Sequence, residues 1–169
     1  IVLDDINERP ATPAPAPPPS EPGEDDLDGV FAHLRDEASR RSALEAAEAE
    51  YKRGLALHRA GQIDEGIPSL QAASRAPRLR FVTALLLGRI YRDRGMTPQA
   101  IEWFERAAEA PAPTVGEGHA LLYELADALE SVGEVARALA ICMELQADVG
   151  DYRDVAARVD RLAKVQTRG

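Results

Sequence analysis

The sequence predicts an all-α fold built from helical hairpins that stack on one another. Three observations lead to this prediction. A pattern of small and large apolar residues recurs with a period of 34 residues, apolar residues within each segment recur every three or four positions, and alanine is abundant while aromatics make up only 5%. The short period indicates amphipathic helices, and alanine is the best helix former. The long period indicates a solenoid, because one hairpin cannot bury its own apolar face.

The clearest copy of the pattern spans residues 81–111, FVTALLLGRIYRDRGMTPQAIEWFERAAEAP. Residues of the same kind stand 34 positions earlier and, after a four-residue insertion, 38 positions later. We expect the small residue of the first helix to allow close helix approach, and the glycine between the helices to form the turn. The equivalent sets are Gly54, Gly88 and Ala126; Leu57, Tyr91 and Leu129; Gly61, Gly95 and Gly133; and Leu70, Phe104 and Cys142.

This pattern resembles the tetratricopeptide repeat over about residues 47–148. The resemblance implies a three-repeat tetratricopeptide α-solenoid, with repeats at about 43–77, 78–111 and 115–148. It also implies a non-catalytic protein–protein interaction module, a scaffold or adaptor. The layout is similar to the C-terminal repeat domain of larger bacterial proteins, so we expect this chain to be part of such a protein.

Two further helices are predicted at the ends of the repeats, which makes eight helices in all. The apolar stripe of Leu27, Val30, Phe31 and Leu34 predicts a leading helix at 26–41, and a capping box at Ser42 predicts that a new helix begins at 43. We expect this leading helix to pack on the domain; the alternative is that it docks on another protein.

Residues 151–166 are predicted to form a capping helix that begins after Asp151. One side of this helix is apolar, and we expect it to cover the end of the stack. The other side is polar and includes Arg158, which we expect to face water.

Residues 1–25 are predicted to be a disordered acidic and proline-rich linker or tail. Residues 10–25 contain seven prolines, which remove backbone donors and prevent both helix and sheet. The net charge of the whole chain is −9, and residues 1–28 hold eight acidic side chains against one basic side chain. The remainder is therefore nearly neutral, and without a basic stripe we expect no nucleic acid partner.

The sequence shows no sign of membrane insertion, of a cofactor or of catalysis. Its longest apolar run, residues 84–87, is too short to span a bilayer, and its start does not resemble a signal peptide. With a single cysteine, Cys142, at a core position, we expect a cytoplasmic protein. The histidines stand too far apart to suggest a metal site, so we expect neither a metal nor an enzyme.

The resemblance implies a concave groove lined by the first helix of each hairpin, which would bind an extended or helical peptide of mixed charge. The groove is predicted to be basic near Arg89 and Arg92 and acidic near Glu124, Asp127 and Glu130. Two alternatives stay open: a regulatory domain of a signalling or envelope-assembly protein with helix 26–41 as an intramolecular latch, and a self-assembly module that forms a homo-oligomer. The candidate groove residues are Tyr51, Lys52, Leu55, His58, Arg59, Leu86, Arg89, Arg92, Tyr123, Glu124, Asp127 and Glu130.

Overall fold

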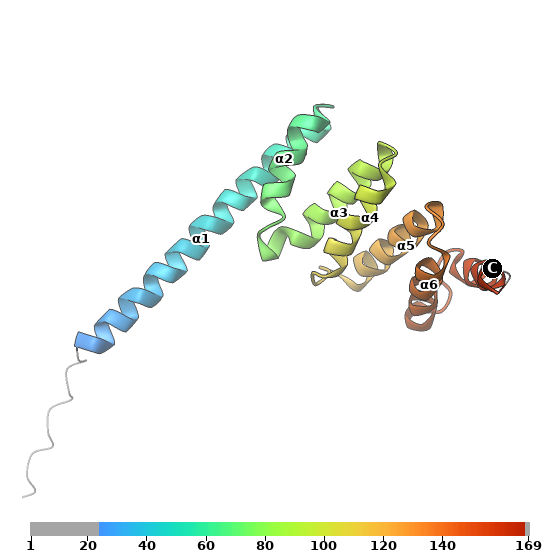
Figure 1. Ribbon diagram of the computed structural model, residues 1–169. Helices are drawn as coiled ribbons and strands as arrows, with labels where there is room; N and C mark the ends of the chain where they lie inside the picture. Colours follow the sequence, from blue (N-terminus) through green and yellow to red (C-terminus); the bar gives the residue numbers. More distant parts are fainter. Residues whose placement is uncertain (1–23, 168–169) are drawn as a thin grey trace, which may run out of the picture. The chain divides into compact units, whose positions relative to one another are not determined.

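The structure, a computed structural model, describes residues 24–167, and these residues form seven helices and no strand. The predicted linker therefore lies almost wholly outside the described residues. The all-α prediction is confirmed. The helices are α1 Glu24–Arg59, α2 Ile63–Ala73, α3 Pro77–Asp93, α4 Thr97–Ala108, α5 Val115–Ser131, α6 Val135–Val149 and α7 Val155–Gln166 (Figure 1).

The predicted break between a leading helix and the first repeat is wrong, because α1 runs without interruption from Glu24 to Arg59. No glycine or proline stands near Ser42. The helix therefore continues through that residue, and the local capping signal is not used. The chain divides into two units inside this helix, one ending at Ala38 and the other covering Ser39–Gly169. Where the 26–41 segment docks stays a prediction.

Helices α2 to α7 follow one another as antiparallel neighbours, with α3 beside α4 and α5 beside α6 (Figure 1). The hairpin turns use the predicted glycines: φ is 78° at Gly61, 73° at Gly95 and 83° at Gly133. In the central turn the amide of Met96 donates to the carbonyl of Tyr91 at 2.9 Å, which closes the end of α3. Glycine occupies these turns because a side chain would strain a positive φ.

The close helix contact predicted for the small residues is present in the first two hairpins. A Cβ atom on Gly54 would lie 2.7 Å from Cγ of Leu70, and one on Gly88 would lie 2.4 Å from Cδ1 of Phe104. In the third hairpin the equivalent pair is Ala126 and Cys142, each 1% exposed. The alanine of the third pair already carries a Cβ atom, and its partner is the smaller cysteine. The two positions therefore complement each other in volume.

The hydrophobic core is centred on α3 to α6 and is thinner in the first repeat, where Gly54 is the one buried residue described for α1. The largest side chains that are fully buried are apolar and come from α2, α3, α4, α5, α6 and α7. They are Leu70, Leu87, Phe104, Leu121, Leu129, Leu145 and Val155. Because α7 contributes Val155 and Leu162 to this core, it covers the end of the stack as predicted.

One helix start differs from the sequence prediction, and another carries a capping interaction that was not predicted. The last helix begins at Val155 rather than at 151, and Asp154 rather than Asp151 stands at its N-cap. At α5, Thr114 accepts a hydrogen bond from the amide of Glu117 at 3.2 Å and donates to the Glu117 carboxylate at 2.9 Å. The sequence prediction lacks this capping interaction, although Thr114 and Glu117 have the required spacing.

Candidate partner-binding surface

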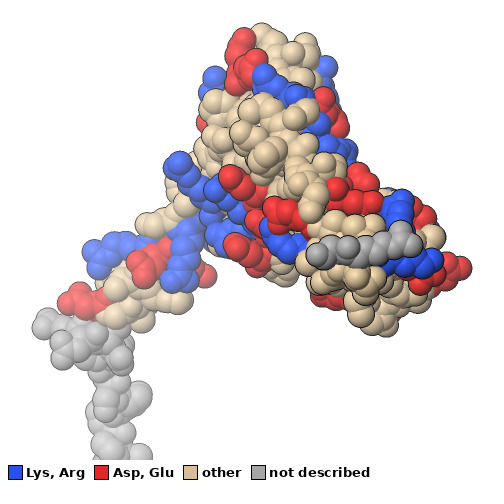
Figure 2. Space-filling model, turned by 45° about the vertical axis from the view of Figure 1, so that its right-hand side comes forward, with Lys and Arg blue, Asp and Glu red and all other residues tan. Residues whose placement is uncertain are grey.

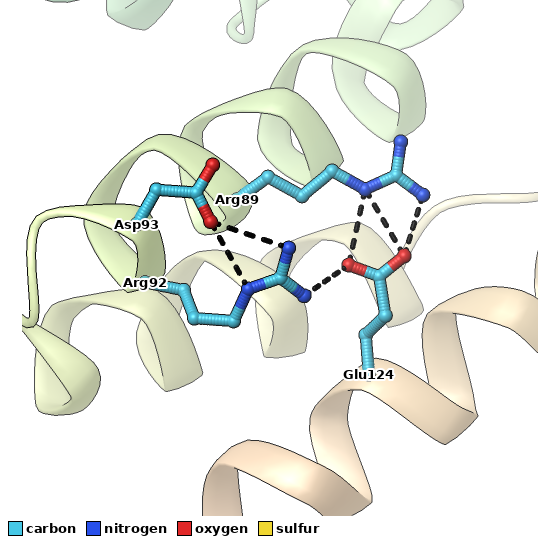
Figure 3. Close-up of polar contacts among 4 residues, drawn as sticks. All are labelled: Arg89, Arg92, Asp93 and Glu124. Carbon is cyan, nitrogen blue, oxygen red and sulfur yellow. Dashed lines mark hydrogen bonds and ion pairs between the residues drawn. The ribbon is translucent and has the colours of Figure 1, made fainter.

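Arg89 and Arg92 of α3 both point at Glu124 of α5 (Figure 3). The Nη2 atom of Arg89 donates to Oε1 of Glu124 at 2.5 Å, its Nε donates to both carboxylate oxygens at 3.0 Å, and Nη1 of Arg92 donates to Oε2 at 2.7 Å. Arg92 also reaches Asp93 at 3.4 Å. The predicted basic centre of the groove is thus partly compensated by a carboxylate that was predicted to belong to its acidic end.

The surroundings of Glu124 keep it charged. Its side chain is only 14% exposed, and this burial disfavours the carboxylate. The hydrogen bonds and charges of Arg89 and Arg92 outweigh the burial, so the pKa of Glu124 lies below its ordinary value. The hydrogen bond to Glu124 in turn raises the pKa of Arg89. The pairs are therefore fully ionised at neutral pH.

A second set of ion pairs joins α5 to α7. Nη2 of Arg158 donates to Oδ1 of Asp127 and to Oε2 of Glu130, each at 2.9 Å, and Nη2 of Arg161 donates to Oε1 of Glu130 at 2.5 Å. Arg158 is 3% exposed, so the prediction that it faces water is wrong. Burial would lower the pKa of Arg158, but its bonds to Glu130 and Asp127 raise it.

Tyr123 connects this second set to the end of the last helix. Its hydroxyl donates to Oδ1 of Asp154 at 2.7 Å, and this hydrogen bond raises the pKa of Tyr123. The guanidinium carbon of Arg158 lies 5.0 Å from the centre of the Tyr123 ring. Nη1 of Arg158 is the one buried side-chain nitrogen or oxygen without a hydrogen-bond partner among the described residues, and a cation–π contact with Tyr123 is available to that guanidinium.

The structure brings Tyr123, Asp127 and Glu130 together around a shallow polar hollow. Its other lining residues come from the end of α5 and from α7, and are Ser131, Asp154, Arg158 and Arg161. Asp154, Arg158 and Arg161 were not predicted as part of the site. The sequence contains a pattern that could have predicted Arg158 and Arg161. The i, i+3 pairs Arg89/Arg92, Asp127/Glu130 and Arg158/Arg161 alternate in sign from α3 to α5 to α7.

The candidates on α1 stand apart from these ion pairs. Tyr51, Leu55 and His58 are partly buried, whereas Lys52 and Arg59 are exposed. Between residues 24 and 167 neither Lys52 nor Arg59 lies within ion-pair distance of a carboxylate. On the next first helix, Leu86 is partly buried at the edge of the core. This end of the candidate surface is therefore apolar with free positive charges.

The surface as a whole has mixed and largely compensated charge. Basic and acidic side chains stand beside one another over much of the face seen in Figure 2. Of the twelve predicted residues, the structure groups Arg89, Arg92 and Glu124 at one place and Tyr123, Asp127 and Glu130 at another. No ion pair or side-chain hydrogen bond joins the α1 candidates to either group in the described part of the chain.

Several other chemistries have no site among residues 24–167. No cluster of three or more metal-ligating side chains occurs there. Cys142 is 1% exposed, and burial raises the pKa of its thiol, which disfavours the reactive thiolate. None of the helices in this range combines the length and the apolarity that crossing a bilayer requires.

Comparison with known proteins agrees with the geometry. Residues 83–117, which contain α4 and most of α3, match the family model of the tetratricopeptide repeat. The hairpin formed by α3 and α4 thus resembles a tetratricopeptide repeat in sequence as well as in geometry. The helix pairs α3–α4 and α5–α6 share this hairpin arrangement, and α7 packs against α6 at the end of the described stack.

A solved structure supports the same fold. The N-terminal domain of stress-induced protein-1 (STI-1) from C. elegans superposes with a TM-score of 0.60 at 13% identity, covering 72% of this chain and 97% of that domain. At this identity the likeness concerns the fold alone. A search of curated proteins gave no significant match.

Proposed function

We propose that this tetratricopeptide-repeat domain binds a peptide or helix of a protein partner on the surface formed by its first helices α1, α3 and α5. Domains of this family generally serve as protein–protein interaction modules. The observation that carries the proposal is the pair of arginines at the centre of this surface, which are held in place but remain accessible.

Glu124 orients Arg89 and Arg92 without occupying all their donors. Nη1 of Arg89 takes no part in the bonds to Glu124, and the two arginine side chains are 42% and 34% exposed. A carboxylate or carbonyl of a partner can therefore bind guanidinium groups whose orientation is already set. Preorganisation of this kind lowers the entropy cost of binding.

The apolar part of the proposed site comes from the same first helices. Leu86 on α3 and Tyr51 and Leu55 on α1 are partly exposed, and Lys52 and Arg59 add unpaired positive charge. The site thus favours a partner segment that combines apolar side chains with acidic ones. The acidic end expected at Asp127 and Glu130 is neutralised by α7, so it offers little attraction for a basic segment.

Site-specific photo-crosslinking tests the proposal. A photoreactive residue at Lys52 or Leu86 is expected to cross-link a captured partner, whereas the same residue at Glu102, exposed on the second helix α4, is not. Cross-linking from Glu102 alone would show that the other side of the domain is the binding side.

A matched pair of charge changes separates binding from folding. Lys52→Glu is expected to weaken capture and Glu102→Lys to leave it unchanged, because both residues are exposed and neither change should alter the helix content. Equal loss of capture in the two variants would argue against a site on the first helices.

A further inference from the structure

An apolar groove lies between α1 and the junction of α2 with α3, and it shares no residue with the surface proposed above. Its volume is about 690 Å³, which is enough for several side chains. The floor consists of small or apolar residues, and three arginines stand around it. The floor residues are Ala43, Leu44, Ala46, Ala47, Ala72, Ala76 and Pro77, and the arginines are Arg40, Arg75 and Arg78.

The three arginines are free to receive an acidic occupant. Arg40, Arg75 and Arg78 are all exposed, and none has a carboxylate within ion-pair distance among residues 27–167. By contrast, the arginines of the α3–α5 and α5–α7 contacts are paired. The groove therefore combines a shallow apolar floor with uncompensated positive charge, which fits an amphipathic helix that carries large apolar side chains and acidic flanks.

The chain itself carries a helix of this chemistry. Leu27, Val30, Phe31 and Leu34 are 43%, 54%, 57% and 51% exposed, and they form one stripe of α1. At about 100° per residue, Asp28 and Arg35 lie on one side of that stripe and Glu37 lies on the other. The stripe offers large side chains where the groove offers alanines. The 27–38 segment carries three acidic side chains against one arginine, so its net negative charge is opposite to that of the three groove arginines.

We propose that the chain self-associates by placing the 27–38 segment of one copy in the Arg40–Arg78 groove of a second copy. This contact covers two apolar surfaces at once. The contact surfaces of the two copies are different, so the assembly either closes through a reciprocal pair of contacts or grows head to tail. The proposal does not use the first-helix binding surface and stands or falls independently of it.

Charge exchange tests both surfaces together. A groove variant, Arg75→Glu with Arg78→Glu, and a helix variant, Asp28→Lys with Glu37→Lys, change exposed residues only. Each variant alone then carries like charges on helix and groove. We expect the full 169-residue wild type to associate in a concentration series followed by light scattering after size exclusion, and each variant alone to stay monomeric.

An equimolar mixture of the two variants is expected to associate again, because each helix then meets a groove of opposite charge. The matched control, Arg53→Glu with Lys164→Glu, makes the same charge change at exposed positions outside both the groove and the first-helix surface, and should associate like the wild type. Circular dichroism checks that the helix content of every variant is unchanged.

Three results would overturn the proposal. The first is a wild type that stays monomeric up to high micromolar concentration, and the second is a mixture that fails to associate. The third is a groove variant that associates as well as the wild type does. The last result would mean that the 27–38 stripes pair with each other or with another surface. A small-residue groove that binds only a helix from a different protein would also leave the wild type monomeric.

Discussion

Replacing Gly88 with alanine will destabilise the domain, although alanine is the better helix former. Gly88 lies inside α3 and is buried against α4. A Cβ atom there would stand 2.4 Å from Cδ1 and 2.5 Å from Cε1 of Phe104. The Phe104 ring is fully buried, with 0% exposure, so it cannot swing into solvent to make room. The helices must move apart or the ring must leave its rotamer.

Two opposing effects set the magnitude. Alanine in a helix interior is favoured over glycine by about 1 kcal/mol. Overpacking a core costs about 1–3 kcal/mol, and a contact this short belongs at the upper end. The net loss is therefore about 2 kcal/mol, which corresponds to a fall in Tm of roughly 6–10 °C for a domain of this size.

Urea unfolding followed by circular dichroism measures this loss. Gly116→Ala is the matched control: Gly116 also lies in a helix, but a Cβ atom there would meet nothing within 4 Å, so the substitution should be neutral or stabilising. In Gly88→Ala with Phe104→Leu, the smaller side chain should relieve the contact, and the double variant should lose less than the sum of the single changes. If Gly88→Ala is as stable as the wild type or more so, the close approach of α3 and α4 is refuted.

Three other predictions follow from the same contacts. Glu124→Gln should lower the free energy of unfolding by about 1–2 kcal/mol at neutral pH, because it removes the carboxylate that two arginines share. The pKa of Glu124 is lowered in the folded state, so its contribution is present above the ordinary value of 4.5 and is lost as the pH falls through the folded pKa. Urea unfolding of both proteins at neutral pH and at about pH 3 checks this, and an undiminished difference in acid would contradict it. Arg158→Ala should cost about 1.5–3 kcal/mol, because a buried side chain loses its hydrogen bonds to the carboxylates of Asp127 and Glu130. Arg161→Ala, an exposed neighbour, is the control in the same urea titration. Cys142 should react with a thiol reagent only on unfolding, since it is 1% exposed; rapid labelling of the native protein would show that the α6 core is open.

The local features of the fold could be predicted from residue type and spacing. The 34-residue period, with its four-residue insertion before the third copy, predicts glycine turns at Gly61, Gly95 and Gly133, all of which have positive φ. It also predicts close helix approach at Gly54 and Gly88, and the structure places these glycines against Leu70 and Phe104. These predictions succeeded because turns and helix stripes depend on residues a few positions apart, and the repeat then copies one hairpin along the chain.

The charge pattern of the candidate surface depends on contacts that spacing alone does not reveal. Glu124 lies 35 positions from Arg89, and Asp127 lies 31 positions from Arg158. Whether such residues neutralise each other or face a partner is decided by the distance between side chains on different helices. The polar character of Arg158 predicts that it faces solvent, yet its two carboxylate partners make its burial favourable.

Local propensity and a repeated apolar pattern were enough to predict the turns, most of the helices and the repeated hairpin architecture of this protein. Three features needed the packed structure: α1 continues through Ser42, the arginines of α3 share Glu124, and an arginine-lined groove lies at the α2–α3 junction. Each of these is a competition between a local signal and interactions across the helix or between helices. Packing geometry sets the outcome, because the type of a residue does not determine which side chains distant in sequence it will contact.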